Sequence, residues 1–397
     1  MSIAIKVTAA LERSSWIRRM FEEGAELRHR FGADKVYDFT LGNPDTEPPE
    51  ALRAKLLELA SHPAPGMHRY MNNAGYDDTR AAVAKRLSNG APEVLTQNHV
   101  VMTCGAGGAL NVVLKTILNP SEEVIILAPY FVEYKFYIDN HGGKPVEVWT
   151  DKQTFQPDLD ALEAAITPQT RALILNSPNN PTGVIYPLST LQEIGALLER
   201  KSTEYQHTIY AISDEPYARI AYDGVGVPNV FAAIKNSVVV TSHSKDLALP
   251  GERIGFLAAN PQLEEISQFM DGAIFCNRVL GFVNAPALAQ RLVADLQEES
   301  VDAKLYEHKR DLLYDNLTAL GFKMVKPQGA FYLFPEAPGG DDIAFARLCQ
   351  KHNVLIVPGS GFGAPGYFRL AYCIDDSIIE RSLPAWKAIA NDAGLKA

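Results

Sequence analysis

The sequence predicts an α/β fold in which a large domain carries a mostly parallel seven-stranded sheet covered by helices, together with a smaller α/β domain. Short β-branched runs alternate with helical patterns between residues 100 and 257, which is typical of a parallel sheet covered on both faces. Runs such as Ser237–Thr241 show no alternation of apolar and polar residues, as expected for strands buried on both sides. The pattern changes near residue 285, which indicates the second domain.

The predicted elements follow in chain order. The seven strands are expected at Val100–Thr103, Val124–Leu127, Val146–Val148, Ala172–Asn176, Ile209–Ser213, Ser237–Thr241 and Ile254–Leu257. Helices are expected near 107–118, 131–140, 158–166, 188–201 and 285–320, with later strands at 329–334, 354–358 and 367–372. We therefore expect an N-terminal segment and part of the small domain at 1–45, the large domain at 46–289 and the small C-terminal domain at 290–397.

Composition excludes several classes of protein. The chain has 37 Lys and Arg against 47 Asp and Glu, a net charge of −10, which argues against nucleic-acid and anionic-membrane partners. Its four cysteines form no CxxC pair, so we expect neither a metal site nor a disulfide framework. No stretch is apolar for the ~18 residues of a membrane span, and no signal peptide is indicated. We expect a cytoplasmic protein.

The candidate chemistry lies after the strands, because ligands bind outside the carboxyl ends of the strands in open α/β sheets. The first turn, "CGAGGAL" (104–110), has small residues that let backbone N–H groups approach an anion. A dinucleotide site would require glycine at Leu110 and an acid after the next strand, where Ala128 and Pro129 stand. The turn therefore predicts a single phosphate, or simply a tight turn.

Three further strand ends carry aromatic or polar groups. Tyr130 and Phe131 offer rings on which a planar ligand could stack, or they belong to the core. The loop "SPNNPTG" (177–183) is rigid and polar. Asp214 ends a buried strand, where a carboxylate costs several kcal/mol unless it is paired. A protonated ring nitrogen is one suitable partner, and an N-cap role is the alternative.

The stretch "TSHSKDLALPGERIG" (241–255) adds a lysine and an arginine to this sheet edge. Alone, Lys245 and Arg253 would be read as solvated surface charges. Beside the other strand ends, a partly desolvated Lys245 suits a Schiff-base nucleophile and Arg253 suits bidentate phosphate binding. Together the groups fit a flat, phosphorylated aldehyde with a basic ring nitrogen, which is pyridoxal 5'-phosphate.

The motifs "NSPNNPTG", "SDEPY" and "SHSKDLALPGERIG" resemble those of the class I/II aminotransferases of pyridoxal-phosphate fold type I, in the aspartate aminotransferase superfamily. The resemblance runs from about residue 34 to the C-terminus. It implies that the large domain binds the cofactor, that Lys245 bonds to its aldehyde and later moves protons, and that Asp214 pairs with its ring nitrogen. It also implies a homodimer with shared active sites.

The resemblance implies further contacts. The phenolic oxygen would be bound by Asn180 and Tyr217, the ring by Phe131, and the phosphate by Ala106, Gly107, Ser242, Arg253 and, across the dimer, Tyr70. The substrate would be bound by Asn180, by Arg369 at its α-carboxylate, by the Gly42 backbone and, for a distal carboxylate, by Arg278. The first 30 residues and the segment 271–286 differ from the commonest aspartate-specific subgroups.

The predicted activity is ping-pong transfer of an amino group between an amino acid, aspartate-like by preference, and a 2-oxo acid. Alternatives on the same fold are an alanine or aromatic aminotransferase and a carbon–sulfur β-lyase, because Lys245 and Asp214 would serve all of them. A ligand-sensing module of a transcription regulator would need an attached DNA-binding domain, whereas only about 33 residues precede the match. A nicotinamide dehydrogenase is disfavoured by Leu110.

Overall fold

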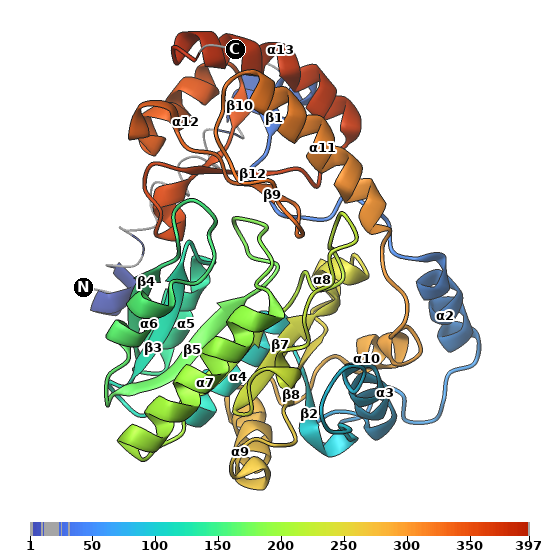
Figure 1. The fold of residues 1–397 in the computed structure, drawn as a ribbon. Helices are drawn as coiled ribbons and strands as arrows, with labels where there is room; N and C mark the ends of the chain where they lie inside the picture. Colours follow the sequence, from blue (N-terminus) through green and yellow to red (C-terminus); the bar gives the residue numbers. More distant parts are fainter. Residues whose placement is uncertain (1–2, 9–10, 12–23, 25, 31, 396–397) are drawn as a thin grey trace. The chain divides into compact units, whose positions relative to one another are not determined.

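The computed structural model describes residues 3–8, 11, 24, 26–30 and 32–395 of the chain. Of the N-terminal segment expected at 1–45, positions 1–2, 9–10, 12–23, 25 and 31 lie outside this description. The chain folds into two compact units, each shown in Figure 1. The smaller unit comprises Met1–Asn43, Tyr306–Pro327 and Phe331–Ala397, and the larger unit comprises Pro44–Leu305 and Gln328–Ala330.

The larger unit is built on a seven-stranded sheet, which confirms the predicted α/β architecture. The strand order is β2-β8-β7-β6-β5-β3-β4, and β8 is the strand that runs antiparallel to both of its neighbours. The strands are β2 (Val100–Thr103), β3 (Glu123–Ala128), β4 (Lys144–Trp149), β5 (Thr170–Asn176), β6 (Tyr210–Asp214), β7 (Ser237–Ser242) and β8 (Gly255–Ala259). Every residue of β2, β7 and β8 is buried, whereas the edge strand β4 is largely exposed. This burial explains why the inner strands lack alternation.

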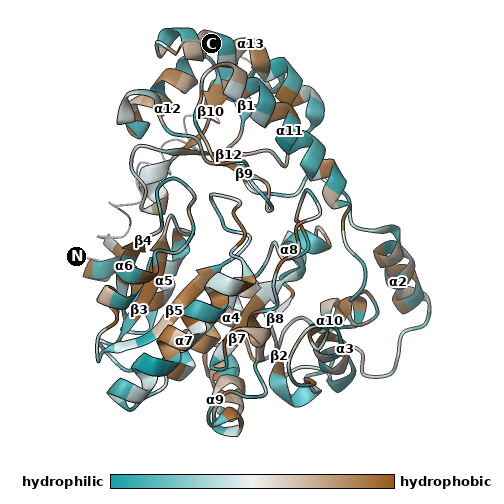
Figure 2. Ribbon diagram, in the orientation of Figure 1, coloured by the Kyte–Doolittle hydropathy of each residue, from teal (hydrophilic) through white to brown (hydrophobic). Residues whose placement is uncertain are grey.

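The helices of the larger unit pack on this sheet or on one another. They are α2 (Glu50–Ser61), α3 (Asp77–Leu87), α4 (Gly105–Ile117), α5 (Glu133–Asn140), α6 (Leu159–Ala165), α7 (Leu188–Tyr205), α8 (His243–Asp246), α9 (Ile266–Val279) and α10 (Ala287–Ala294). One core cluster joins residues of α4, α5 and α9, such as Val113, Ile138 and Met270, to inner-strand residues such as Ile126 and Val240. Figure 2 shows these strands as mostly hydrophobic, and α7 lies in front of them in Figure 1. Since full burial of each large aliphatic side chain contributes about 1.5–3 kcal/mol, this core holds the strand ends in place.

The segment after α9 belongs to the larger unit. A single helical stretch was expected at 285–320, but two helices form, α10 and α11 (Ala303–Ala319). Helix α10 packs against α2 and α3, and the Gln290 side chain accepts a hydrogen bond from the Tyr76 N–H at 2.9 Å. The change between units therefore falls at Leu305/Tyr306, further along the chain than the boundary expected at 289/290.

The smaller unit combines short strands with helices. Strand β1 (Tyr37–Asp38) pairs in parallel with β10 (Val354–Leu355), and an antiparallel sheet has the order β11-β12-β9. The other elements are β9 (Tyr332–Leu333), β11 (Val357–Pro358), β12 (Phe368–Ala371), α12 (Asp342–Lys351), α13 (Asp376–Asp392) and most of α11. The fully buried Trp386 of α13 packs against Phe39, Phe322 and Phe368, with ring centroids 5.8–6.3 Å apart. This aromatic core joins the N-terminal segment to the C-terminal part of the chain.

In the described part of the chain, no helix combines the length and the apolar character that crossing a bilayer requires.

Candidate active site

The predicted cofactor-binding side chains of the larger unit lie on the turns at one edge of its sheet. The parallel strands β2, β3, β5, β6 and β7 all end there, and β8 begins there. The register pairs Asn176 with Asp214 and Asp214 with Val240, so the strand ends of β5, β6 and β7 are adjacent. Because the strands are buried, the positions of these turns are fixed by the core rather than by their own sequences.

Asp214 is the most informative group at this edge. Its side chain is buried, and its Oδ2 accepts a hydrogen bond from the Tyr134 hydroxyl of α5 at 2.5 Å. Among the described residues, its Oδ1 has no hydrogen-bond partner. Burial raises the pKa of the Asp214 carboxyl to about 7, although the Tyr134 hydrogen bond acts to lower it. A buried carboxylate with one spare oxygen fits a cationic N–H partner, which a protonated pyridine ring supplies.

The asparagine loop is tied to the same strand end. The Asn176 side chain donates to the Asp214 main-chain oxygen at 2.8 Å and accepts from the Asn180 N–H at 2.7 Å. The Asn179 side-chain oxygen Oδ1 accepts hydrogen bonds from the N–H and the hydroxyl of Thr182, at 3.1 and 2.9 Å. Asn180 itself is 5 % exposed. The loop "SPNNPTG" is therefore a buried, internally hydrogen-bonded structure.

Lys245 lies on the short helix α8, with Ser242 at the position before its first residue. Lys245 is half-buried, whereas its neighbours His243, Ser244 and Asp246 are buried. The His243 N–H donates to the Ile254 carbonyl at 3.0 Å, and the His243 carbonyl accepts from the Leu249 N–H at 3.1 Å. The turn that carries Lys245 is thus fixed on both sides, which suits a lysine that must react at a defined place.

Buried charges support this turn from inside. The Asp246 carboxylate lies 3.3 Å from His243 Nδ1 and 3.7 Å from the Arg86 guanidinium. Burial acts to raise the pKa of the Asp246 carboxyl, but His243 and Arg86 outweigh it and the pKa is lowered. Asp246 is therefore ionised at neutral pH. Tyr217, the other predicted residue near the Asp214 strand end, is 4 % exposed.

A cradle for an anion lies at the start of α4. A Cβ atom built on Gly105 would lie 2.9 Å from Arg253 Nη2, and one on Gly107 would lie 3.0 Å from the Tyr137 hydroxyl. Arg253 has a left-handed backbone, φ 50°, and donates from Nη1 to the Pro250 carbonyl at 3.0 Å. The absence of side chains at Gly105 and Gly107 therefore lets a guanidinium and a hydroxyl approach the helix N-terminus closely, and this set of donors suits phosphate.

Phe131 lies beside this group of residues. It packs edge-on against Tyr134, with ring centroids 5.6 Å apart and an interplanar angle of 81°. Tyr130, in contrast, is buried and donates to Glu147 at 2.6 Å. Of the two aromatic residues at this turn, Phe131 is therefore the one that neighbours the Asp214 partner.

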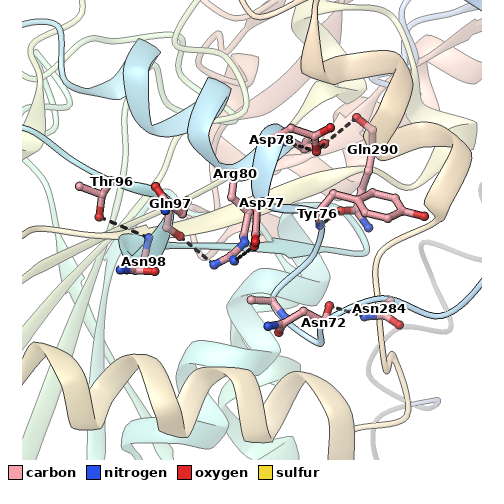
Figure 3. Close-up of polar contacts among 12 residues, drawn as sticks. Asn72, Tyr76, Asp77, Asp78, Arg80, Thr96, Gln97, Asn98, Asn284 and Gln290 are labelled. Carbon is pink, nitrogen blue, oxygen red and sulfur yellow. Dashed lines mark hydrogen bonds and ion pairs between the residues drawn. The ribbon is translucent and has the colours of Figure 1, made fainter.

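Tyr70 lies on a loop anchored to the segment after α9. It is 88 % exposed. Two contacts anchor the chain just before α3: the Asn284 side chain donates to the Asn72 carbonyl at 2.8 Å (Figure 3), and Gln290 Oε1 accepts from the Tyr76 N–H at 2.9 Å. The Asn284 carbonyl lies 3.9 Å from the sulfur of Cys104, directly before α4. This chain of contacts fixes the loop next to the first turn of α4.

Arg278 is not brought into this group by any contact that the structure records. It is exposed on the last turn of α9, and its guanidinium lies over the ring of Phe275 at 5.4 Å. Phe275 and Val279 on the same helix are 54 % and 49 % exposed. These residues form an exposed, partly apolar face within the segment 271–286.

In the smaller unit, Arg369 and Gly42 form a separate arrangement. The Arg369 guanidinium lies between the rings of Tyr332 and Phe362, 4.6 and 4.7 Å from their centroids, and donates to the Thr40 carbonyl at 2.7 Å. A Cβ on Gly42 would collide with the Tyr332 hydroxyl, so glycine is required there. The two rings and the hydrogen bond to Thr40 hold the guanidinium in place, which suits a carboxylate ligand.

The sequence analysis missed Tyr134 and Tyr137. Both lie on α5, three residues apart, and both reach the cofactor-binding edge. Their signal was present in "FVEYKFY", where aromatic residues recur at helical spacing after a strand end. It was not distinguishable from a core-facing stripe, because the sequence does not say which face of the helix meets Asp214.

Comparisons with known proteins give the same class. The family model for aminotransferases of class I and II matches residues 34–384. An aspartate/prephenate aminotransferase of Thermus thermophilus is 32 % identical over 379 residues, covering 93 % of this chain and 94 % of that protein. The aromatic-amino-acid aminotransferase 2 of Thermococcus litoralis is also 32 % identical, covering 94 % of this chain and 97 % of its own length.

Solved structures agree with these sequence matches. An aminotransferase from Eubacterium rectale superposes with a TM-score of 0.94 at 37 % identity, covering 99 % of both chains. An aspartate aminotransferase of Thermus thermophilus with maleate superposes with a TM-score of 0.83 at 29 % identity, covering 94 % of this chain and 95 % of that one. Fold and family together define a pyridoxal-phosphate-dependent transferase. The chain belongs to the class I and II aminotransferase family, in the aspartate aminotransferase superfamily, as its motifs predicted.

Proposed function

We propose that this aminotransferase takes its amino group from an aspartate-like amino acid, and that Lys245 and Asp214 are its central catalytic residues. The observation that carries these roles is the buried Asp214 carboxylate, whose Oδ1 has no partner among the described residues. A carboxylate in that state requires a cationic N–H, and this is the group that a pyridine ring presents. Transfer follows a ping-pong route, because the donor leaves as a 2-oxo acid before the second 2-oxo acid binds and receives the amino group.

The proposed role of each residue follows from its position and its chemistry. When bound, pyridoxal phosphate supplies the electron sink for bond breaking at the substrate Cα. Lys245 Nζ takes the Cα proton as general base, and Asp214 holds a proton on the ring nitrogen. Asn180 and Tyr217, both buried, donate to the phenolic oxygen and keep the ring oriented.

Other residues bind and position. Phe131 stacks on the ring, and the phosphate is held by the Ala106 and Gly107 backbone, Ser242 and Arg253. Tyr70, which is 88 % exposed, would extend to the phosphate in a second subunit, so we propose a homodimer with shared active sites. We also propose a cytoplasmic location, on the ground that all four cysteines are free thiols.

Substrate recognition is proposed to begin with the α-carboxylate. Arg369 would bind it with a fork already oriented by Tyr332 and Phe362, assisted by the Gly42 backbone and Asn180. Arg278, exposed on α9, would bind the distal carboxylate. Relatives whose names include aspartate/prephenate and aspartate aminotransferase support the acidic donor.

A second candidate is an aromatic amino donor. It is favoured by the 32 % identity to the aromatic-amino-acid aminotransferase of Thermococcus litoralis and by the exposed position of Arg278. An alanine aminotransferase and a carbon–sulfur β-lyase remain alternatives, because Lys245 and Asp214 would serve those reactions too.

The test is a single half-reaction. Enzyme mixed with amino acid alone should release one equivalent of 2-oxo acid and lose the yellow absorbance of the bound cofactor, with aspartate reacting faster than phenylalanine or alanine. A β-lyase would instead release pyruvate and ammonia from cystathionine. Lys245→Ala should abolish both the absorbance and the half-reaction, and the matched control Lys235→Ala, at a surface lysine paired with Glu264 at 3.2 Å, should retain both. A yellow, active Lys245→Ala protein would refute the proposal.

A further inference from the structure

Helix α5 carries two tyrosines on one face. Tyr134 and Tyr137 are three residues apart, so their side chains project to the same side of the helix. The Tyr134 hydroxyl is bonded to Asp214, at the end proposed for the cofactor ring nitrogen. The Tyr137 hydroxyl lies 3.0 Å from the place where a Gly107 Cβ would be, at the start of α4. The two phenols therefore reach the two ends of the proposed cofactor site.

The first turn of α4 lacks side-chain donors. Its residues are Gly105, Ala106, Gly107 and Gly108, none of which has a polar side chain. The first four N–H groups of a helix have no partner within the helix, and its N-terminus carries about half a positive charge. A phosphate dianion accepts more hydrogen bonds than one such turn donates, so further donors are needed from outside it. Arg253 approaches the turn at Gly105, and Tyr137 approaches it at Gly107.

We infer that the Tyr137 hydroxyl is a ligand of the cofactor phosphate, supplying the side-chain donor that the glycine-rich turn lacks. The inference rests on the proposed function, in which this turn and Arg253 bind the phosphate. Tyr137 is a binding residue and takes no part in proton transfer at the substrate. Its ligand class is an organic phosphate monoester.

The surroundings hold this hydroxyl in place as a donor. Burial, together with the negative charges of Glu133 and Asp214, raises the pKa of Tyr137 to about 12, against the opposing effect of Arg253. The phenol is therefore protonated at neutral pH. Helix α5 is held on α4 because His141 Nε2 lies 3.1 Å from Asn111 Oδ1, while Asn111 donates to the Gly107 carbonyl at 2.8 Å.

The glycine at 107 gives independent support. A methyl group there would lie 3.0 Å from the Tyr137 oxygen and 3.6 Å from the ring carbon that bears it. The contact is tight for the hydroxyl alone and ordinary for the ring. Position 107 thus tolerates a side chain only if the hydroxyl moves, and a moved hydroxyl would lose its place at the turn.

The test compares two ligands that differ only in the phosphate. Full-length protein freed of cofactor is titrated with pyridoxal 5'-phosphate and with pyridoxal, following absorbance of the bound form. Tyr137→Phe should weaken the binding of pyridoxal phosphate about 10- to 100-fold, which is the range expected for loss of a hydrogen bond to a charged group. Binding of pyridoxal should stay within about twofold. The phosphorus-31 resonance of the loaded variant should also shift.

The matched control is Tyr134→Phe. Its hydroxyl acts on Asp214, which faces the ring common to both ligands, so this variant should change both affinities by the same factor. Equal weakening of both ligands by Tyr137→Phe, or weakening of neither, would overturn the inference. Loss of the yellow form in Lys245→Ala tests the proposed function separately. If the proposed function failed that test, the ratio of the affinities for pyridoxal phosphate and pyridoxal could still be measured.

Gly107→Ala in the wild-type background covers the case in which Tyr137→Phe does not fold, and the double variant adds a check for the case in which it does. Gly107→Ala in the wild-type background should weaken pyridoxal phosphate selectively, because the new methyl displaces the hydroxyl. In folded Tyr137→Phe protein, Gly107→Ala should reduce the affinity for pyridoxal phosphate much less, because the hydroxyl that the new methyl would contact is absent. An unchanged preference for pyridoxal phosphate over pyridoxal in Gly107→Ala would contradict the inference.

Discussion

The hydrogen bond from Tyr134 to Asp214 gives a quantitative prediction. Tyr134→Phe removes the one donor seen on the Asp214 carboxylate among the described residues, at 2.5 Å, and leaves the carboxyl as deeply buried as before. A hydrogen bond to a charged group contributes about 1.5–3 kcal/mol, and one pKa unit corresponds to about 1.4 kcal/mol. The Asp214 pKa, about 7 in the wild type, should therefore rise by roughly one to two units in the variant.

The effect is measurable as a change in stability with pH. The folded-state pKa of Asp214 lies above the ordinary aspartate value of 3.8, so the folded state binds one more proton than the unfolded state between these two values. The free energy of unfolding should then fall as pH rises through this window, by about 4 kcal/mol in total for a shift of about three units. In Tyr134→Phe the fall should continue one to two pH units higher before it levels off.

Urea unfolding of the cofactor-free protein at a series of pH values measures this slope. Asp214→Asn should remove the part of the pH dependence of the unfolding free energy that comes from Asp214. Tyr130→Phe, which removes a hydroxyl bonded to Glu147, should behave as the wild type. Desolvation also raises the pKa of the half-buried Glu215 carboxyl to about 7, so the difference between Asp214→Asn and the wild type isolates the contribution of Asp214. The reasoning is refuted if the Tyr134→Phe profile levels off at the same pH as the wild type or at a lower one.

Three further predictions concern other residues. Arg369→Ala should raise the KM for every amino donor at least tenfold, since a charge-assisted pair is lost, while Arg369→Lys should recover only part because lysine lacks the fork; an unchanged KM would remove its role. Arg278→Ala should slow the reaction with aspartate and glutamate but not the reaction with alanine. Equal effects on all three donors would reject a contact between Arg278 and a distal carboxylate. Asp246→Asn should lower the free energy of unfolding at pH 7 by about 3 kcal/mol, because Arg86 and His243 lose a buried partner. Because the Asp246 pKa is lowered, that loss should shrink as pH falls below the ordinary aspartate value of 3.8, and a loss that stays constant with pH would contradict the pairing.

The sequence by itself determined the class of the fold, and it predicted which residues follow the strands at the edge proposed to bind the cofactor. Buried parallel strands have mostly apolar runs in the sequence, such as Ser237–Thr241. The residues that follow these runs lie at one common edge of the sheet. Lys245 and Asp214 could therefore be grouped without coordinates. Arg369 was indicated only by the family motif, because nothing in its own strand distinguishes it from a surface arginine.

The tertiary structure decided what contacts these residues make. Whether Asp214 is buried, which of its oxygens accepts a bond, and that Tyr134 is the donor all depend on how α5 packs against the sheet, a rotation that helical spacing leaves undetermined. The same packing brings Tyr137 over Gly107, although thirty residues separate them in the sequence. Local sequence specifies a helix and its apolar stripe, whereas only the assembled core specifies which polar groups along that stripe meet.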